Sequence, residues 1–301
     1  MTAALDPPMT DAALAVAYSL ACAITMGLFG FLVRRAESRA NAVTGVLIGL
    51  AVSLPFMAAA TAYLWEPGWW SWKALGLFAA AGAINPAVGR VFLFLSIHRL
   101  GLARAVPLVS ALPLATAGLG IAFLGERPGP IVLAGTLLVT GGCMAITSRK
   151  GMEGRWDRRF LWMPFVSVAA FSVAHLWQKM GLVLVPSPIL GLTVMSLSGA
   201  ACLLLFGGLL PQAHRPVLGS GAAWIYLGLT GLLNTVSILF HFSALRYGDL
   251  TIVAPLFSTA PFFSLLLSWA FLRESERVTL WVVAGTALVA LGGVLIGWRA
   301  L

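Results

Sequence analysis

A single arginine stands deep inside one of the long apolar stretches of this chain. Arg90 lies within the stretch 74–97, about 6 Å past its centre at a helical rise of 1.5 Å per residue. A guanidinium at that depth costs at least a few kcal/mol, so it must face protein, water or a bound molecule. One interpretation is a site for an anion, because guanidinium binds carboxylate or phosphate through two parallel donors. The other is that Arg90 holds carbonyls freed near Asn85 and Pro86, where proline removes a helical hydrogen bond.

A second polar stripe occupies the stretch 160–184. Phe171, His175 and Gln178 follow a spacing of 4 and 3 and therefore share one face of a helix. Near the middle of the membrane His175 can bind a substrate or take up a proton near neutral pH, and it can equally serve as a neutral hydrogen-bonding residue between helices. Lys179 is expected to extend its charge toward the interface. Trp177 is a candidate for an apolar wall of the same site.

A third stripe, in the stretch 221–245, consists of Asn234, Ser237 and His241 at spacings of 3 and 4. Such residues commonly form interhelical hydrogen bonds in membranes, which we favour for Ser237. For Asn234 and His241 both roles stay open: a hydrogen bond between helices, or a place in a shared cavity that faces Asn85 and Arg90 across the pseudo-twofold axis. The candidate substrate-binding residues are thus Arg90, Asn85, His175, Gln178, Trp177, Asn234 and His241.

The acidic residues are absent from these stretches, since all ten lie in predicted loops or at span ends. This argues against an intramembrane aspartyl protease, a carboxylate-ligated metal site and carboxylate-driven export of cationic drugs. No phosphate-cradling loop, zinc-binding helix or nucleophile elbow occurs either. We therefore predict no catalytic residue, metal or cofactor, and a protein that is not an enzyme.

The composition identifies the elements that must position these residues. Of 301 residues, 60% are hydrophobic and 10% are charged, with a mean hydropathy of +0.95. A soluble domain carries about 25% charged residues, so a soluble protein is excluded. The net charge of +9 is typical of basic loops that orient membrane spans, and not of a nucleic-acid partner. The three cysteines lie in apolar runs and indicate packing residues, not disulfides.

The apolar windows predict an all-α integral membrane protein with ten transmembrane helices. They lie near 11–33, 42–64, 74–97, 103–124, 129–147, 160–184, 188–210, 221–245, 250–272 and 278–298. The longest connection, 148–159, is also the most basic and falls at the middle of the chain. It separates a first five-helix unit, 11–147, from a second, 160–298.

The two halves repeat each other. At an offset of 148 residues, twelve of the 35 positions from Phe92 to Glu126 are identical to those from Phe240 to Glu274. Because each unit has an odd number of spans, the second must cross the membrane upside down. Inverted repeats of this kind are the architecture of secondary transporters, which bind substrate near the midplane.

Paired prolines recur at matching positions of the two halves. Pro107 and Pro113 match Pro255 and Pro261, and they interrupt the fourth and ninth spans. Interrupted helices at corresponding positions point to the binding region and supply bending points. Ser110 and its counterpart Ser258 are expected to bond the freed carbonyls.

These residues resemble the EamA-type transporters of the drug/metabolite transporter superfamily. The resemblance rests on Gly101-Leu-Ala-Arg-Ala-Val-Pro-Leu, Pro113-Leu and Leu124-Gly-Glu-Arg127, with a weaker second copy ending at Leu272-Arg-Glu274. It implies ten helices, alternating access, and movement of a small metabolite, often an amino acid. It also implies a cavity lined by spans 1, 3, 4, 6, 8 and 9. Arg273 replaces the glycine of the first copy, Gly125.

We therefore expect a multi-pass protein of a bacterial inner membrane that moves a small metabolite, such as an amino acid or another carboxylate. Proton coupling through a histidine is a candidate feature; a lipid-linked precursor flippase is the alternative, ahead of a membrane enzyme or an assembly subunit. Thirteen basic residues on one side against five on the other favour both termini outside, whereas relatives are usually drawn with termini inside. Orientation, substrate, direction and oligomeric state stay open.

Overall fold

The computed structural model describes residues 10–36, 42–147, 157–206, 221–271 and 280–300, and every structural statement below refers to them. They form helices and short connections, with no β-strand among them. Nine helical stretches are long and apolar enough to cross a bilayer, and Gly49–Tyr63 is a shorter apolar helix. With that helix as the second span, the predicted ten-helix architecture is confirmed.

The helices follow the predicted spans closely. Their bounds are α1 Asp11–Ala36, α2 Ala42–Tyr63, α3 Trp72–Ile84, α4 Val91–Leu100, α5 Leu102–Val109, α6 Leu112–Leu124, α7 Pro130–Thr147, α8 Trp162–Leu184, α9 Pro188–Phe206, α10 Gly221–Tyr247, α11 Leu250–Phe257, α12 Ala260–Phe271 and α13 Leu280–Ala300. Three short segments complete the list, namely the 3₁₀ turns η1 Pro67–Trp69 and η3 Arg158–Phe160 and the π-helical η2 Asn85–Arg90. Most of the inter-repeat loop and the second-copy Glu274 lie outside the described residues.

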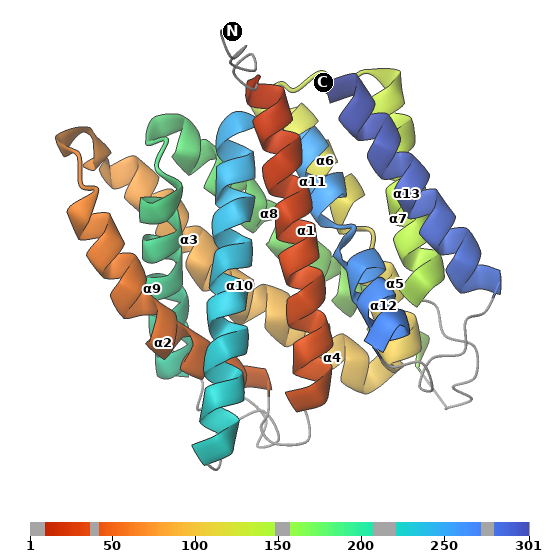
Figure 1. Cartoon of the computed structure of the whole chain (residues 1–301), viewed down its shortest axis with the longest axis horizontal. Coiled ribbons are helices and arrows are strands. Elements are labelled where there is room, and N and C mark those ends of the chain that lie inside the picture. The colour runs from red at the N-terminus through yellow and green to blue at the C-terminus, as the bar shows by residue number, and fades with distance from the viewer. Residues whose placement is uncertain (1–9, 37–41, 148–156, 207–220, 272–279, 301) are drawn as a thin grey trace, which may run out of the picture.

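The helices stand side by side as a bundle (Figure 1). One end of the bundle, which we call the terminal face, carries the start of α1, the end of α13 and the α6–α7, α8–α9 and α10–α11 connections. Because each repeat has five spans, α8 runs opposite to α1, its counterpart. The α10–α11 turn therefore lies at the terminal face, whereas the matching α4–α5 turn lies at the opposite one.

Three of the ten spans are interrupted. The third agrees with the predicted span 74–97 and is helical from Trp72 to Leu100, but its geometry changes to π-helical at η2, between α3 and α4. The fourth is divided into α5 and α6 at Ser110–Ala111, and the ninth into α11 and α12 at Ser258–Thr259. Each break exposes backbone groups that must find partners inside the protein.

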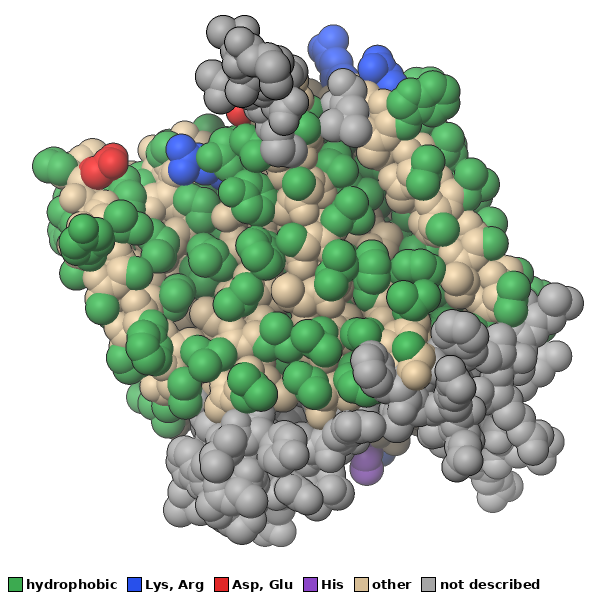
Figure 2. Space-filling model, viewed as in Figure 1, with side chains coloured by type: hydrophobic (Ala, Val, Ile, Leu, Met, Phe, Trp, Pro, Cys, Tyr) green, Lys and Arg blue, Asp and Glu red, His purple; other side chains and the backbone are tan. Residues whose placement is uncertain are grey.

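The surface matches a lipid environment. On the face shown in Figure 2 the side chains between the two ends are mainly hydrophobic, and the visible charged side chains lie near the ends. Large apolar side chains such as Phe123, Leu205 and Val294 are 68%, 76% and 65% exposed, as lipid-facing residues are. Trp65, Trp70 and Trp72 gather at the α2–α3 connection with their rings edge to face, where an interfacial aromatic belt is expected.

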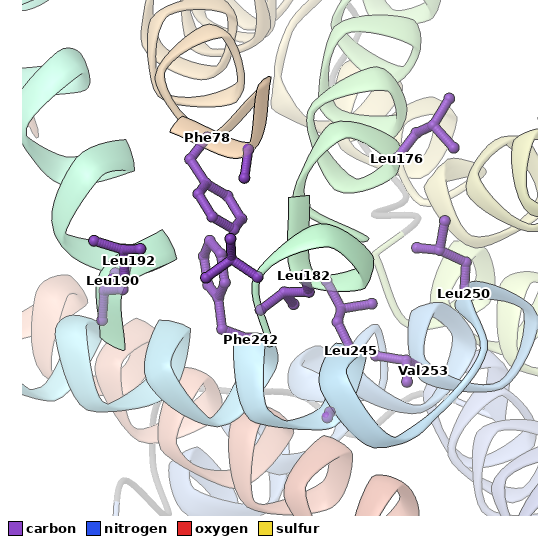
Figure 3. Packing of buried hydrophobic residues seen from close by; sticks show 12 residues of the cluster. Phe78, Leu176, Leu182, Leu190, Leu192, Phe242, Leu245, Leu250 and Val253 are labelled. Atoms are coloured by element: carbon purple, nitrogen blue, oxygen red, sulfur yellow. The ribbon is translucent and has the colours of Figure 1, made fainter. Parts of the chain in front are cut away.

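Buried apolar side chains form the main core between α3, α8, α9, α10 and α11. Phe78 and Phe242 stand at its centre with ring centroids 6.0 Å apart (Figure 3). Their rings need the space left by two glycines: a Cβ on Gly181 would lie 2.5 Å from Phe78, and one on Gly191 would lie 2.7 Å from Phe242. Glycine thus allows aromatic side chains to fill the gap between helices.

The last helices of the two repeats, α7 and α13, pack backbone to backbone (Figure 1). A Cβ on Gly142 would lie 2.6 Å from the carbonyl oxygen of Gly285, and one on Gly135 would lie 2.9 Å from that of Gly292. Gly141, one residue from this contact, has nothing within 4 Å of its Cβ position. The close approach therefore depends on one glycine of each adjacent pair.

These neighbours make a matched test of the α7–α13 contact. Gly142→Ala should force the helices apart and lower stability by about 1–3 kcal/mol, the range for overpacked sites. Gly141→Ala should be neutral or raise stability by about 1 kcal/mol, since alanine is the better helix former. Thermal unfolding in detergent, followed by size-exclusion chromatography, measures both. Equal effects of the two variants would contradict the described contact.

Candidate functional site

Arg90 ends a π-helical turn in the middle of the third span. This span runs from Trp72 to Leu100, and Arg90 lies four residues past its centre, about 6 Å along the axis. Single π turns are frequent at functional sites because they widen the helix and free backbone groups. Pro86, within the turn, has no N–H to donate.

One backbone carbonyl of this turn is bonded by the neighbouring helix α8. The hydroxyl of Ser167 donates to the carbonyl oxygen of Gly89 at 2.8 Å. A Cβ at position 89 would lie 2.4 Å from the Phe171 ring, so only glycine leaves room for this side chain. The Arg90 guanidinium donates to no described residue and forms no ion pair with one. Its side chain is partly accessible although it lies deep in the span.

Two histidines meet in the interior from different helices. His175 of α8 and His241 of α10 have ring centroids 4.9 Å apart, and Phe257 of α11 lies edge-on to both at 5.2 and 4.6 Å. Nδ1 of His175 and both ring nitrogens of His241 are buried without a partner among the described residues. A neutral imidazole offers one N–H donor and one acceptor nitrogen, so the pair has unused capacity in both roles.

Gln178 continues this stripe one turn further along α8. Its Nε2 donates to the sulfur of Met195 at 3.3 Å, whereas its Oε1 is buried without a partner. A sulfur acceptor is weak, so this amide is also poorly satisfied. Unpaired buried polar atoms are rare in native proteins, and each calls for a bound group or water. Three such side chains on two adjoining helices define a polar site in the second repeat.

The structure brings three of the predicted residues together in the interior. His175, Gln178 and His241 share the interior, and Phe171 links α8 to the Arg90 turn. The side chains of Asn85, Asn234 and Trp177 are partly buried and make no hydrogen bond to a described residue.

Ser237, one turn before His241, has the structural role favoured from the sequence. It accepts a hydrogen bond from Thr25 Oγ1 at 2.9 Å and donates to the carbonyl oxygen of Cys22 at 3.0 Å, both on α1. On α10, Ser237 therefore binds α1, whereas His241 faces His175 of α8.

The paired prolines lie at the two helix breaks. Pro107 and Pro255 are inside α5 and α11, and Pro113 and Pro261 are in the first turns of α6 and α12. In the first break the hydroxyl of Ser110 donates to the carbonyl of Val106 at 3.1 Å. In the second, Thr259 donates to the carbonyl of Leu256 at 2.7 Å, a role that the sequence reading gave to Ser258.

Two charged residues have partners that sequence reasoning missed. Glu126 is buried, with 8% exposure, and its two carboxylate oxygens each accept a backbone N–H of α11 at 2.8 Å, from Leu250 and Thr251. Lys179 donates to the carbonyls of Leu245 and Gly248, both at 2.7 Å, so its ammonium caps the end of α10 instead of reaching the interface. The motif Leu124-Gly-Glu-Arg127 signalled that Glu126 matters, but not what it binds.

Comparison with known proteins places this geometry in a family. The family model described as "EamA-like transporter family" matches residues 13–148 and 160–298. The chain belongs to the EamA-like transporter family. This family is part of the drug/metabolite transporter superfamily, so the resemblance read from the motifs is confirmed. As a member of it, the protein is a multi-pass membrane transporter and not an enzyme.

One curated relative is named as a transporter, and one solved structure has a similar fold. A Sinorhizobium sp. protein called "Uncharacterized transporter in cobO 3'region" is 29% identical over 133 residues, which cover 44% of this chain and 91% of that protein. A solved crystal structure matches with a TM-score of 0.74 and 16% identity, covering 94% of this chain and 97% of its own. The latter shows that the fold is shared.

The unpaired histidines of this EamA-like protein predict a trade-off between stability and function. His241→Leu removes two buried nitrogens without partners, and each such group costs about 1–3 kcal/mol. We expect the variant to have a higher melting temperature in detergent and a lower transport rate. Ser237→Ala, one turn away on α10, removes a paired hydroxyl and should lower the melting temperature. A destabilised His241→Leu protein would mean that the nitrogens are satisfied in the folded state.

Proposed function

We propose that the protein is a secondary transporter that moves a small metabolite with an anionic group, such as an amino acid or another carboxylate, across the cytoplasmic membrane by alternating access. The observation that carries this proposal is Arg90, a guanidinium deep in a span with no protein partner among the described residues. Keeping an unpaired cation at that depth is costly, and an anionic substrate would compensate it.

The competing interpretation of Arg90 finds less support. An arginine that stabilises the broken helix would donate to the carbonyls freed around Asn85–Arg90. The carbonyl of Gly89 instead accepts from Ser167, and Arg90 bonds to no described carbonyl. The turn is therefore stabilised by α8, which leaves the guanidinium available for a carboxylate.

The polar side chains of α8 and α10 supply the rest of the proposed site. Gln178 offers an unused acceptor oxygen, and His175 and His241 offer donors and acceptors. A molecule with one carboxylate and one N–H or O–H donor would satisfy both sets of groups. Phe171 and Phe257 border these positions and would limit the shape of its apolar part.

The same histidines are the proposed route for proton coupling. Histidine is the side chain whose ordinary pKa lies in the physiological range. His175 is the titratable neighbour of His241, and the part of the chain that the structure describes has no carboxylate beside the pair. Uptake of one proton by the pair would give each imidazole a partner, with the other ring as acceptor.

Flux in proteoliposomes tests the substrate class. We would load a pool of amino acids and other small carboxylates and read their movement by mass spectrometry. Arg90→Ala should lower the flux of the transported compound roughly ten- to a hundredfold, the value of a charge-assisted hydrogen bond. Arg90→Lys should restore it only in part, since lysine cannot bind bidentately.

The control is Arg99→Ala, which removes an exposed cation at the end of the same span that lies over the Phe160 ring. It should keep normal flux. If a folded wild-type protein moves none of the pool, the small-metabolite proposal fails. Flipping of a lipid-linked precursor in the same vesicles is then the next measurement.

Proton coupling has its own test. A pH gradient across the vesicle should accelerate flux in the wild type, and His175→Gln should remove the acceleration while retaining basal exchange of substrate. Gradient dependence that survives in both His175→Gln and His241→Gln would contradict coupling through this pair.

A further inference from the structure

The terminal face is closed in this structure by an apolar layer. Phe242 and Leu245 follow His241 along α10 toward that face, and they pack with Phe78, Leu182 and Leu250 (Figure 3). All five side chains are buried, with exposures of 3% or less. A molecule bound beside the histidines could reach the terminal face only if these residues separate. Something must therefore hold the ends of α10 and α11 in place while the face is closed.

Glu126 makes the polar connection above this layer. It belongs to the α6–α7 connection of the first repeat, and its carboxylate binds the first two N–H groups of α11 in the second repeat. The local fold is shaped for this contact. Gly125 adopts φ 70° and turns the chain back, and a Cβ on Gly120 would lie 2.7 Å from Glu126 Oε2. A carboxylate at a helix N-terminus is stabilised by the unpaired N–H groups and the helix dipole.

The residue that ordinarily provides such a cap is present but unused. Asp249 occupies the N-cap position of α11 with φ −71° and ψ 150°, the extended backbone that N-cap residues adopt. Its side chain makes no cap hydrogen bond and is exposed. An N-cap carboxylate accepts from the second or third N–H of its helix, and the second, Thr251, is bonded to Glu126 instead.

Lys179 keeps the α10–α11 turn together on the side of the second repeat. Its ammonium holds the carbonyls of Leu245 and Gly248, and the carboxylates of Glu126 and Asp249 are its charged neighbours. Side chains therefore hold the turn by two bonds inside the second repeat, both from Lys179, and by one connection to the first repeat, through the Glu126 carboxylate. The matching position in the first repeat is Gly101, which has no side chain with which to cap α5.

We propose that Glu126 and Asp249 form the gate latch of the terminal face by exchanging the cap of α11. In the closed state Glu126 caps α11 across the two repeats; in the open state Glu126 withdraws and Asp249 caps the same helix locally. Neither state leaves the Thr251 N–H without an acceptor, so the exchange lowers the cost of opening. The proposal rests on the alternating access proposed above, but it concerns residues outside the substrate site.

The test is a distance measurement across the gate in the absence of substrate. Spin labels would replace Arg127, beside Glu126, and Arg246, beside the α10–α11 turn, in a variant whose Cys22, Cys143 and Cys202 are serine. Both labelled positions are exposed. Pulsed electron paramagnetic resonance in liposomes then gives the ratio of short to long distances for each variant.

The exchange predicts opposite shifts for two charge-neutralising variants. Glu126→Gln weakens the closed-state cap and should raise the long-distance fraction, whereas Asp249→Asn weakens the open-state cap and should lower it. Each ratio should change roughly fivefold, as ordinary N-cap substitutions do. Glu66→Gln, an exposed N-cap acid on the same face without a side-chain cap bond, should leave the ratio unchanged.

Two outcomes would overturn the latch. The first is that Asp249→Asn leaves the distances as they are in the wild type, which would make Glu126 a fixed structural cap. The second is that both variants shift the ratio in the same direction, which would mean that the carboxylates do not compete. Because no substrate is present, either outcome can be read independently of the flux assay, and Asp249→Asn changes an exposed residue whose side chain makes no cap hydrogen bond.

Discussion

Three spans of this protein are broken inside the bilayer, and the backbone groups at the breaks must be satisfied without water. In the third span the Ser167 hydroxyl donates to the carbonyl oxygen of Gly89, and in the ninth the Cys143 thiol donates to the carbonyl oxygen of Ser258 at 3.2 Å. Both partners come from the other repeat. Because a broken helix in a membrane needs such partners, the two halves of the protein are joined at the breaks. The partners are polar side chains at positions where apolar ones would otherwise pack.

Helix α8 makes contacts both with the first repeat and within the second. Along its length, Ser167 supports the π turn, Ser172 accepts from Thr116 of α6 at 3.1 Å, His175 meets His241, and Lys179 caps α10. Residues that bind backbone, residues of the proposed substrate site and the lysine that holds the α10–α11 turn therefore lie on one helix. A movement of α8 would reach the Arg90 turn, the histidine pair and the terminal face together.

The architecture could be predicted from the sequence because its signals are patterns of residue type along the chain. Ten apolar runs, an offset of 148 residues and matched prolines predict the spans, the repeats and the breaks of α5–α6 and α11–α12. The π turn at Asn85–Arg90 was missed because a proline in a span signals a break without its geometry. The contacts of Glu126 and Lys179 were missed for another reason: each binds backbone more than 60 residues away, and backbone partners leave no mark in side-chain spacing.

The two repeats have the same residues at the helix breaks and different residues at the proposed substrate site. Positions that agree include Pro107 with Pro255 and Ser110 with Ser258, and these lie at the helix breaks. At the same offset the proposed site residues have apolar counterparts: Arg90 matches Ile238, His175 matches Gly27 and His241 matches Leu93. Gly27 and Ile238 serve packing, since a Cβ on the former would lie 2.7 Å from Phe263 and the latter borders the main core. A symmetric scaffold supports similar movements toward both faces, whereas a site built from unmatched residues can bind an asymmetric molecule in one orientation.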